Sequence, residues 1–252
     1  MTTSTTPLPN ILDEARRLLR LAEEHSLPMR LIGGLAIRIR SDDGFHPGLS
    51  REYKDIDVVT TRRHGGDVAD LLGSAGYTSA REFNALNSNR RLLFHDQHHD
   101  RKLDVFVGEF AMCHTIPMTE RAMLEPITVP LAELILTKLQ IVELNEKDIR
   151  DLIALFYHHD VAEHDGETIN AAYIARLCAS DWGLWRTTGM NLGRVSIALS
   201  NYDLAQKELE IVIKRLERLS ERIDGEPKSS RWRLRDRIGD RKRWYEEPDD
   251  VE

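Results

Sequence analysis

Two aspartates separated by one residue, Asp55 and Asp57, interrupt an otherwise apolar and β-branched run. Such a run predicts a strand over 55–60. Side chains two positions apart on a strand point to the same face, so the two aspartates should project together while Ile56 and Val58 face a core. Two like charges held so close repel each other, and each is costly to desolvate. The pattern therefore predicts a cation site on a strand. The alternative is a surface strand with two solvated aspartates.

Two further features fit a cation site. A short apolar strand over 29–32 ends at the glycine pair Gly33-Gly34, where the backbone can approach a phosphate closely and a following helix adds a favourable field. Asp104 lies in another predicted strand, 101–108, and would be the third carboxylate. Mg²⁺ binds one or two carboxylates and leaves positions open for phosphates. We therefore expect two Mg²⁺ ions, with Mn²⁺ as an alternative, at Asp55, Asp57 and Asp104.

The chain changes character at Pro130. Before it, predicted strands and helices alternate, with a helix over 10–25 and strands that include 77–83 and 91–95. After it, the apolar spacing predicts only helices. These cover 131–143, 146–158, 168–178, 183–199 and 202–223. The fold class expected is therefore α+β, organised as an α/β domain over 1–129, a helical domain over 130–224 that completes the site, and a polar, basic C-terminal tail over 225–252.

Two charged residues fall on the apolar faces of predicted helices. Lys138 lies near the middle of the apolar arc of the helix over 131–143, and Asp148 lies within the core arc of the next helix. A buried charge needs a partner. One interpretation is an ion pair between Lys138 and Asp148. The other is that Lys138 contacts a triphosphate while Asp148 orients the triphosphate or the acceptor.

The order of these motifs resembles the nucleotidyltransferase superfamily of the DNA polymerase β type, whose signature is a glycine pair, Asp-x-Asp and a later strand aspartate. It is most similar to the abortive-infection toxins of type IV toxin–antitoxin systems. In that branch an arginine precedes the first aspartate by four residues, and a lysine, a basic-Asp pair and a further aspartate follow downstream. The corresponding residues here are Arg51, Lys138, Lys147-Asp148 and Asp151. Tyr53 stands where the branch usually has threonine.

The resemblance implies a nucleotidyltransferase fold followed by a helical bundle. It implies catalytic roles for Asp55, Asp57, Asp104, Lys138 and Asp148, and nucleotide binding by Gly33, Gly34, Arg51 and Lys138. The expected reaction moves a nucleoside monophosphate from ATP or another NTP to an acceptor hydroxyl, with RNA such as tRNA as the acceptor and a cognate antitoxin as a partner. The alternatives are transfer to a small molecule such as an antibiotic, and a nucleotide-binding regulatory module without turnover.

Charge and composition set the remaining expectations. The net charge is −7, yet a basic window lies near the C-terminus. It contains Lys228, Arg231, Arg233, Arg235, Arg237, Arg241, Lys242 and Arg243, with Trp232, Trp244 and Tyr245 between them. Such a segment either binds RNA through phosphate contacts and base stacking, or docks on the acidic body. Two isolated cysteines, no long apolar run and no secretory signal predict a cytoplasmic protein with no membrane partner.

Overall fold

The computed structural model describes residues 6–41, 45–118 and 120–247. It contains two compact units. The first unit comprises 1–40, 52–111 and 116–129, and the second unit comprises 41–51, 112–115 and 130–252. The second unit thus resumes at Pro130. It also includes 41–51 and 112–115, which differ from the predicted boundary because they lie within the domain expected over 1–129, and it includes the C-terminal tail expected as a separate segment.

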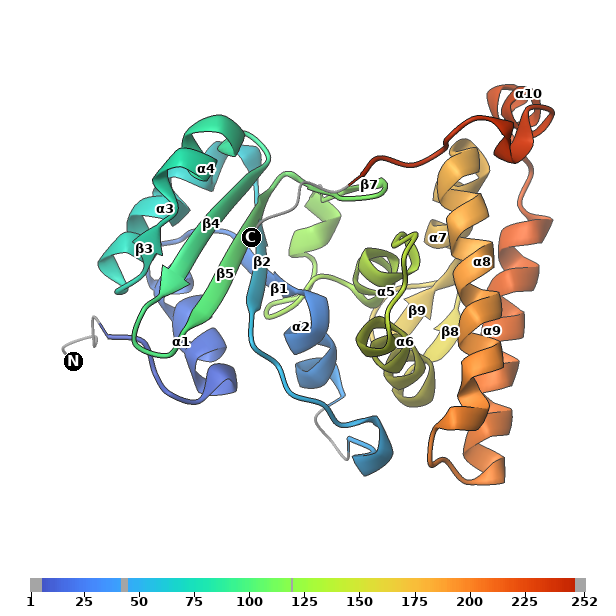
Figure 1. Ribbon diagram of the computed structural model, residues 1–252, viewed down its shortest axis with the longest axis horizontal. Coiled ribbons are helices and arrows are strands. Elements are labelled where there is room, and N and C mark those ends of the chain that lie inside the picture. Colours follow the sequence, from blue (N-terminus) through green and yellow to red (C-terminus); the bar gives the residue numbers. More distant parts are fainter. Residues whose placement is uncertain (1–5, 42–44, 119, 248–252) are drawn as a thin grey trace. The chain divides into compact units, whose positions relative to one another are not determined.

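A five-stranded mixed sheet forms the centre of the first unit (Figure 1). Its strand order is β1-β2-β5-β4-β3, with β2 and β5 parallel and the other neighbouring pairs antiparallel. Side chains of β2 and β5 are fully buried at Ile56, Val58, Leu103 and Val105. The strands are β1 (Met29–Ile32), β2 (Ile56–Thr60), β3 (Thr78–Ser79), β4 (Arg91–Asp96) and β5 (Arg101–Val107).

Four helices accompany this sheet. They are α1 (Ile11–Glu24), α2 (Gly33–Arg40), α3 (Gly65–Ser74) and α4 (Arg81–Asn87). The side chain of Asn10 caps α1 by accepting hydrogen bonds from the backbone N–H groups of Leu12 and Asp13. The predicted strand over 77–83 is wrong beyond Ser79, because α4 begins at Arg81. The short strands β6 (Glu109–Ala111) and β7 (Thr115–Pro117) follow the sheet.

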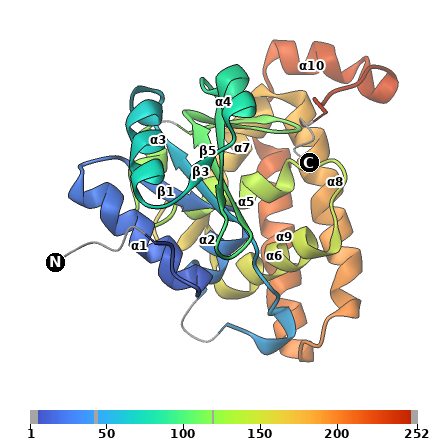
Figure 2. The same cartoon turned by 60° about the vertical axis from the view of Figure 1, so that its left-hand side comes forward.

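The second unit is mainly helical. Its helices are α5 (Leu131–Leu139), α6 (Glu146–His158), α7 (Ala171–Ser180), α8 (Trp182–Ala198), α9 (Gln206–Gly225) and α10 (Ser230–Asp236). Asparagine, aspartate or serine side chains cap four of them, at Asn145, Asn170, Asp181 and Ser229. Figures 1 and 2 both show α10 beside one end of α8.

The prediction of an entirely helical second half is wrong in one place. Two short parallel strands, β8 (Asp160–Ala162) and β9 (Thr168–Asn170), pair with each other before α7. The buried side chains of Val161 and Ile169 lie opposite each other in this pair. The predicted helix over 168–178 therefore begins three residues later. Among the described residues, no helix is long and apolar enough to cross a membrane.

Candidate functional site

Two of the predicted metal ligands are neighbours in the sheet of the first unit. Asp57 on β2 is the register partner of Asp104 on β5. Neighbouring strands lie about 4.8 Å apart, so the two carboxylates occupy adjacent positions on one face. Asp57 is half-buried and Asp104 is buried. We call these two residues the carboxylate pair. Partly buried like charges at this spacing favour binding of a cation between them.

Gly33 lies directly against the carboxylate pair. Its φ of +70° belongs to the left-handed region that glycine adopts without strain. A Cβ atom at this position would lie 2.2 Å from Oδ2 of Asp57. The neighbouring residue Ile32 is the register partner of Asp57, which explains this proximity. Glycine is therefore required at position 33 by both the backbone and the carboxylate. Gly34 is buried in the first turn of α2.

Arg91 on β4 binds one member of the carboxylate pair, Asp104, and was not among the predicted site residues. Its Nε donates a hydrogen bond of 2.7 Å to Oδ1 of Asp104. The guanidinium also lies over the rings of Phe106 and Phe83, at 5.2 and 5.8 Å from their centroids. The register of the sheet explains the contact, because Arg91 lies two positions before Leu93, the register partner of Asp104.

Asp55 lies outside the strand predicted for it. The strand β2 begins at Ile56, and Asp55 is exposed one residue earlier. Among the residues that the structure describes, no three or more His, Cys, Asp and Glu side chains are gathered closely enough to hold a metal ion. The carboxylate pair does fit Mg²⁺, which commonly takes one or two protein carboxylates and completes its shell with water and phosphate oxygens.

The other predicted site residues form a balanced ion network in the second unit. Lys138 Nζ lies 2.7 Å from Oδ1 of Asp148 and 3.1 Å from Oδ2 of Asp151. Arg51 donates two hydrogen bonds of 2.7 Å from Nε and Nη2 to the two oxygens of Asp151. The interpretation of Lys138 and Asp148 as an ion pair is therefore confirmed, and the contact of Lys138 with a triphosphate stays a prediction. The network also includes Asp151 and Arg51, so two cations are paired with two anions.

This ion network stabilises the protonated, positively charged form of Lys138. Burial acts to lower the pKa of the ammonium group, but the nearby carboxylates of Asp151 and Asp148 outweigh burial and raise the pKa above its ordinary value of 10.5. Lys138 is therefore protonated at neutral pH. A charged lysine on an apolar helix face is stable here because two carboxylates meet it.

The aromatic residues of the basic tail pack against α8. The ring of Trp232 lies edge-on to Trp185 with centroids 5.0 Å apart, and Trp244 lies edge-on to Trp182 at 6.1 Å. The Trp244 indole N–H also donates a hydrogen bond of 3.0 Å to Oγ1 of Thr187. The tryptophans predicted to stack on bases are thus engaged in packing, which is the docked interpretation of the tail.

The two acidic residues of the basic window also bind α8. Asp236 accepts a hydrogen bond of 2.7 Å from the Trp182 indole N–H, and Asp240 accepts bonds of 3.0 and 2.8 Å from the guanidinium of Arg186. Arg235 lies over the Trp182 ring, 4.4 Å from its centroid, but most of the other cations of the window point outward. Six of them are exposed: Arg231, Arg233, Arg237, Arg241, Lys242 and Arg243. Docking therefore leaves an outward surface of positive charge.

Comparison with known proteins identifies no relative: no family model, curated protein or solved structure matches this chain.

Proposed function

We propose that the chain is a metal-dependent nucleotidyltransferase of the DNA polymerase β type, which moves a nucleoside monophosphate from an NTP to an RNA hydroxyl. The observation that carries this proposal is the register pairing of Asp57 with Asp104 beside the left-handed Gly33. A toxin-type role with a cognate antitoxin follows from the sequence resemblance and is part of the same proposal.

In this proposal Asp57 and Asp104 would hold the metal from adjacent strands. Mg²⁺, when bound, neutralises the phosphates and favours ionisation of the acceptor hydroxyl. Because Gly33 has no side chain, its backbone lies directly against the Asp57 carboxylate. The N-terminus of α2 favours negative charge nearby. The acceptor oxygen forms a bond to the α-phosphorus, while the bond from that phosphorus to the bridging oxygen breaks. Pyrophosphate leaves with the bonding electron pair, and the hydroxyl proton passes to solvent.

The exposed cations of the basic tail support RNA as the acceptor. Arg231, Arg237, Arg241 and Lys242 form no ion pair with any described residue. Such side chains neutralise phosphates and release counterions, whatever the base sequence. Because the tail tryptophans pack against α8, we expect contact with the RNA backbone rather than base stacking at this surface.

Incubation of the full chain with each labelled NTP, Mg²⁺ and total RNA tests the transfer. We expect label from one or more NTPs in the RNA fraction, lost when EDTA is added. Label on a small product from a lysate, with none on RNA, would replace RNA by a small-molecule acceptor. No labelled product of any size from any NTP would refute transferase activity.

One observation favours a second candidate, a nucleotide-binding module without turnover. Asp104 accepts a hydrogen bond from Arg91, and Asp55 lies outside β2, so the three predicted ligands are not equally placed to bind metal. Calorimetric titration with a non-hydrolysable NTP distinguishes the two functions. Saturable Mg²⁺-dependent binding without any labelled product would establish the second candidate.

Substitution of the four unpaired tail cations by glutamine tests the RNA surface without removing Trp232, Asp236 or Asp240. On single-stranded RNA, each lost phosphate contact should reduce the slope of log affinity against log salt concentration by about 0.7. NTP binding should not change. Identical slopes for the substituted and native chains would exclude this surface from RNA binding.

A further inference from the structure

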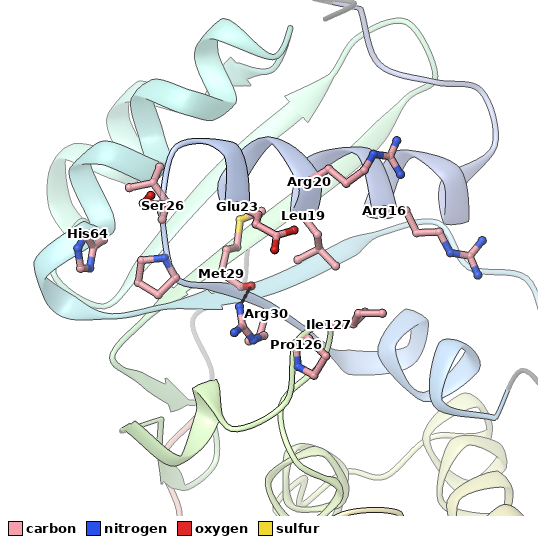
Figure 3. Close-up of a pocket in the computed structure, with 12 residues that line it drawn as sticks. Arg16, Leu19, Arg20, Glu23, Ser26, Met29, Arg30, His64, Pro126 and Ile127 are labelled. Carbon is pink, nitrogen blue, oxygen red and sulfur yellow. Dashed lines mark hydrogen bonds between the residues drawn. The ribbon is translucent and has the colours of Figure 1, made fainter.

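We propose that the first unit contains a second binding site, for a small organic phosphate with an apolar body, in a cavity between α1, β1 and the segment 126–127. The cavity has a volume of about 760 Å³, within the range typical of small-molecule sites. Figure 3 shows α1 on one side and Arg30, Pro126 and Ile127 on the other. All of its lining residues belong to the first unit.

One face of α1 supplies much of the wall. Arg16, Leu19, Arg20 and Glu23 follow the spacing of three and four residues that aligns side chains on one side of a helix. This face differs from the buried face of the same helix, where Arg17 is bound by Glu14 at 2.8 Å. The cavity face combines cations with an apolar side chain, as a site for an amphipathic anion requires.

Arg30 is the most strongly positioned cation in this cavity. Its Nε donates to the carbonyl of Glu125, and its Nη1 donates to the Met29 carbonyl at 2.8 Å. These bonds fix the guanidinium but bring no negative charge, because Arg30 forms no salt bridge with any described residue. Burial lowers the pKa of Arg30, with a smaller opposing effect from Glu23, as expected for a partly desolvated cation that lacks a bound carboxylate.

The charge balance of the lining favours a dianion. Three arginines, Arg16, Arg20 and Arg30, face one lining carboxylate, Glu23, and Arg16 also lies 3.9 Å from Oδ1 of Asp13. Arg20 forms no ion pair with any described residue. His64 adds a ring nitrogen, since its Nδ1 is engaged with Oγ1 of Thr61 at 2.7 Å and Nε2 is the other polar atom of the ring. Arg20 and Arg30, the lining arginines that form no ion pair with a described residue, match the two charges of a phosphate monoester better than the single charge of a carboxylate, and guanidinium groups bind phosphate oxygens in pairs.

Apart from Ser26, the remaining lining is apolar and would receive the body of the ligand. It consists of Leu19, Leu27, Pro28, Met29, Pro126 and Ile127. Ile127 is 42% exposed, a large apolar side chain at the rim that a bound molecule would cover. The cavity adjoins the Met29 end of β1, whereas the carboxylate pair adjoins the Ile32 end, so the two sites are separate.

Calorimetric titration of the full chain in EDTA tests this site, with 1-naphthyl phosphate, 1-naphthol, 1-naphthoate and inorganic phosphate as probes. EDTA removes any metal-dependent phosphate binding at the carboxylate pair. We expect saturable binding of naphthyl phosphate, at least tenfold tighter than binding of the other three. Equal binding of naphthol, naphthoate or inorganic phosphate, or no saturable binding by naphthyl phosphate, would overturn the proposal.

Three substitutions locate the binding. Arg30→Gln and Arg20→Gln should each weaken naphthyl phosphate by roughly tenfold, since each removes a charge-assisted donor. Glu23→Gln should strengthen it several-fold, because a lining carboxylate is lost. Arg20 is exposed and makes no bond that folding requires, so its variant remains informative if Arg30→Gln does not fold. Arg81→Gln, an exposed arginine on α4, is the matched control and should change nothing. Unchanged affinity in both the Arg20 and Arg30 variants would assign the binding to another site.

Discussion

The carboxylate pair and the ion network both place acidic side chains in low-exposure positions, yet their charge balance differs. In the ion network, Lys138 and Arg51 bind Asp148 and Asp151 at 2.7 to 3.1 Å, so two cations meet two anions. In the carboxylate pair, two anions occupy adjacent register positions, and Arg91 binds Asp104. A balanced network stabilises the folded chain by itself, whereas adjacent like charges gain stability from an added cation. The difference separates a structural ionic cluster from a candidate metal site.

The largest expected effect is on activity at the carboxylate pair. Asp57→Asn keeps the shape of the side chain but removes a charge that would bind metal. If metal supplies several kcal/mol to the transition state, transfer should fall by roughly a thousandfold. Without Mg²⁺ the variant should unfold at or above the native temperature, because repulsion with Asp104 is relieved. Activity assays and melting curves in EDTA test both points, with the exposed Asp70→Asn as control. Near-native turnover by the Asp57 variant would contradict the metal role.

The next effect is on stability in the ion network. Lys138→Met leaves Asp148 without its lysine and Asp151 with Arg51 only. Breaking a buried pair costs roughly 3–5 kcal/mol, much more than the loss of an exposed pair. Denaturant unfolding measures the difference. Arg243→Gln, which removes the exposed pair with Glu247, is the control and should cost less than about 0.5 kcal/mol. Equal, small losses in both variants would show that the ion network is not structural.

The same network predicts a pH dependence. Because folding raises the pKa of Lys138 above 10.5, its stabilisation is complete below that value and is lost as pH rises through the raised pKa. The deficit of Lys138→Met relative to the native chain should be constant from about pH 7 to 9 and shrink only at higher pH. A deficit that shrinks on acidification through this range would contradict the assignment. Titration of the same variant with a non-hydrolysable NTP tests the separate prediction that Lys138 contacts triphosphate.

Gly33→Ala should cost about 2 kcal/mol. The left-handed backbone alone costs an L residue roughly 1–2 kcal/mol, and the new Cβ would displace the Asp57 carboxylate. The matched control is Gly66→Ala on α3, where a Cβ meets no atom within 4 Å. That substitution should be neutral or stabilising by up to about 1 kcal/mol. Thermal unfolding of both variants measures the contrast, and effects of the same sign would show that Gly33 has no special role.

A change at Arg91 tests the comparison most directly. Arg91→Gln removes the cation from Asp104 and should cost roughly 1–3 kcal/mol in metal-free buffer. If the carboxylate pair binds Mg²⁺, the ion can take the place of this charge. The rise in melting temperature on adding Mg²⁺ should then be larger in the variant than in the native chain. A smaller rise, or none, would indicate that Arg91 supports the metal site rather than competing with the metal.

Local patterns predicted much of this molecule. The α+β class, the glycine turn before α2 and the strands that carry Asp57 and Asp104 follow from apolar spacing and glycine position. The helix α4 was missed because the short apolar stretch near Tyr77 does not distinguish a strand from a helix. Arg91 was missed because its partner Asp104 is set by sheet register, which one sequence does not specify. Asp151 entered only through the family resemblance, although it binds both Lys138 and Arg51.

The tail shows a different kind of gap. A segment of interleaved cations and tryptophans looks the same in sequence whether it binds RNA or packs against a helix of its own chain. The surface of α8 determines which of the two occurs, because Trp182, Trp185 and Arg186 on that helix contact the tail. These residues lie some fifty positions earlier, and no local pattern connects them with Trp232 or Asp240.

This docking has a consequence for spectroscopy. The chain has four tryptophans, and all of them, Trp182, Trp185, Trp232 and Trp244, lie where α8 meets the tail. Intrinsic tryptophan fluorescence therefore reports on one corner of the second unit, and the first unit contributes only tyrosine emission. Release of the tail would alter the emission spectrum while the sheet stayed folded. Unfolding of the sheet would be nearly invisible to this probe, and circular dichroism would have to follow it.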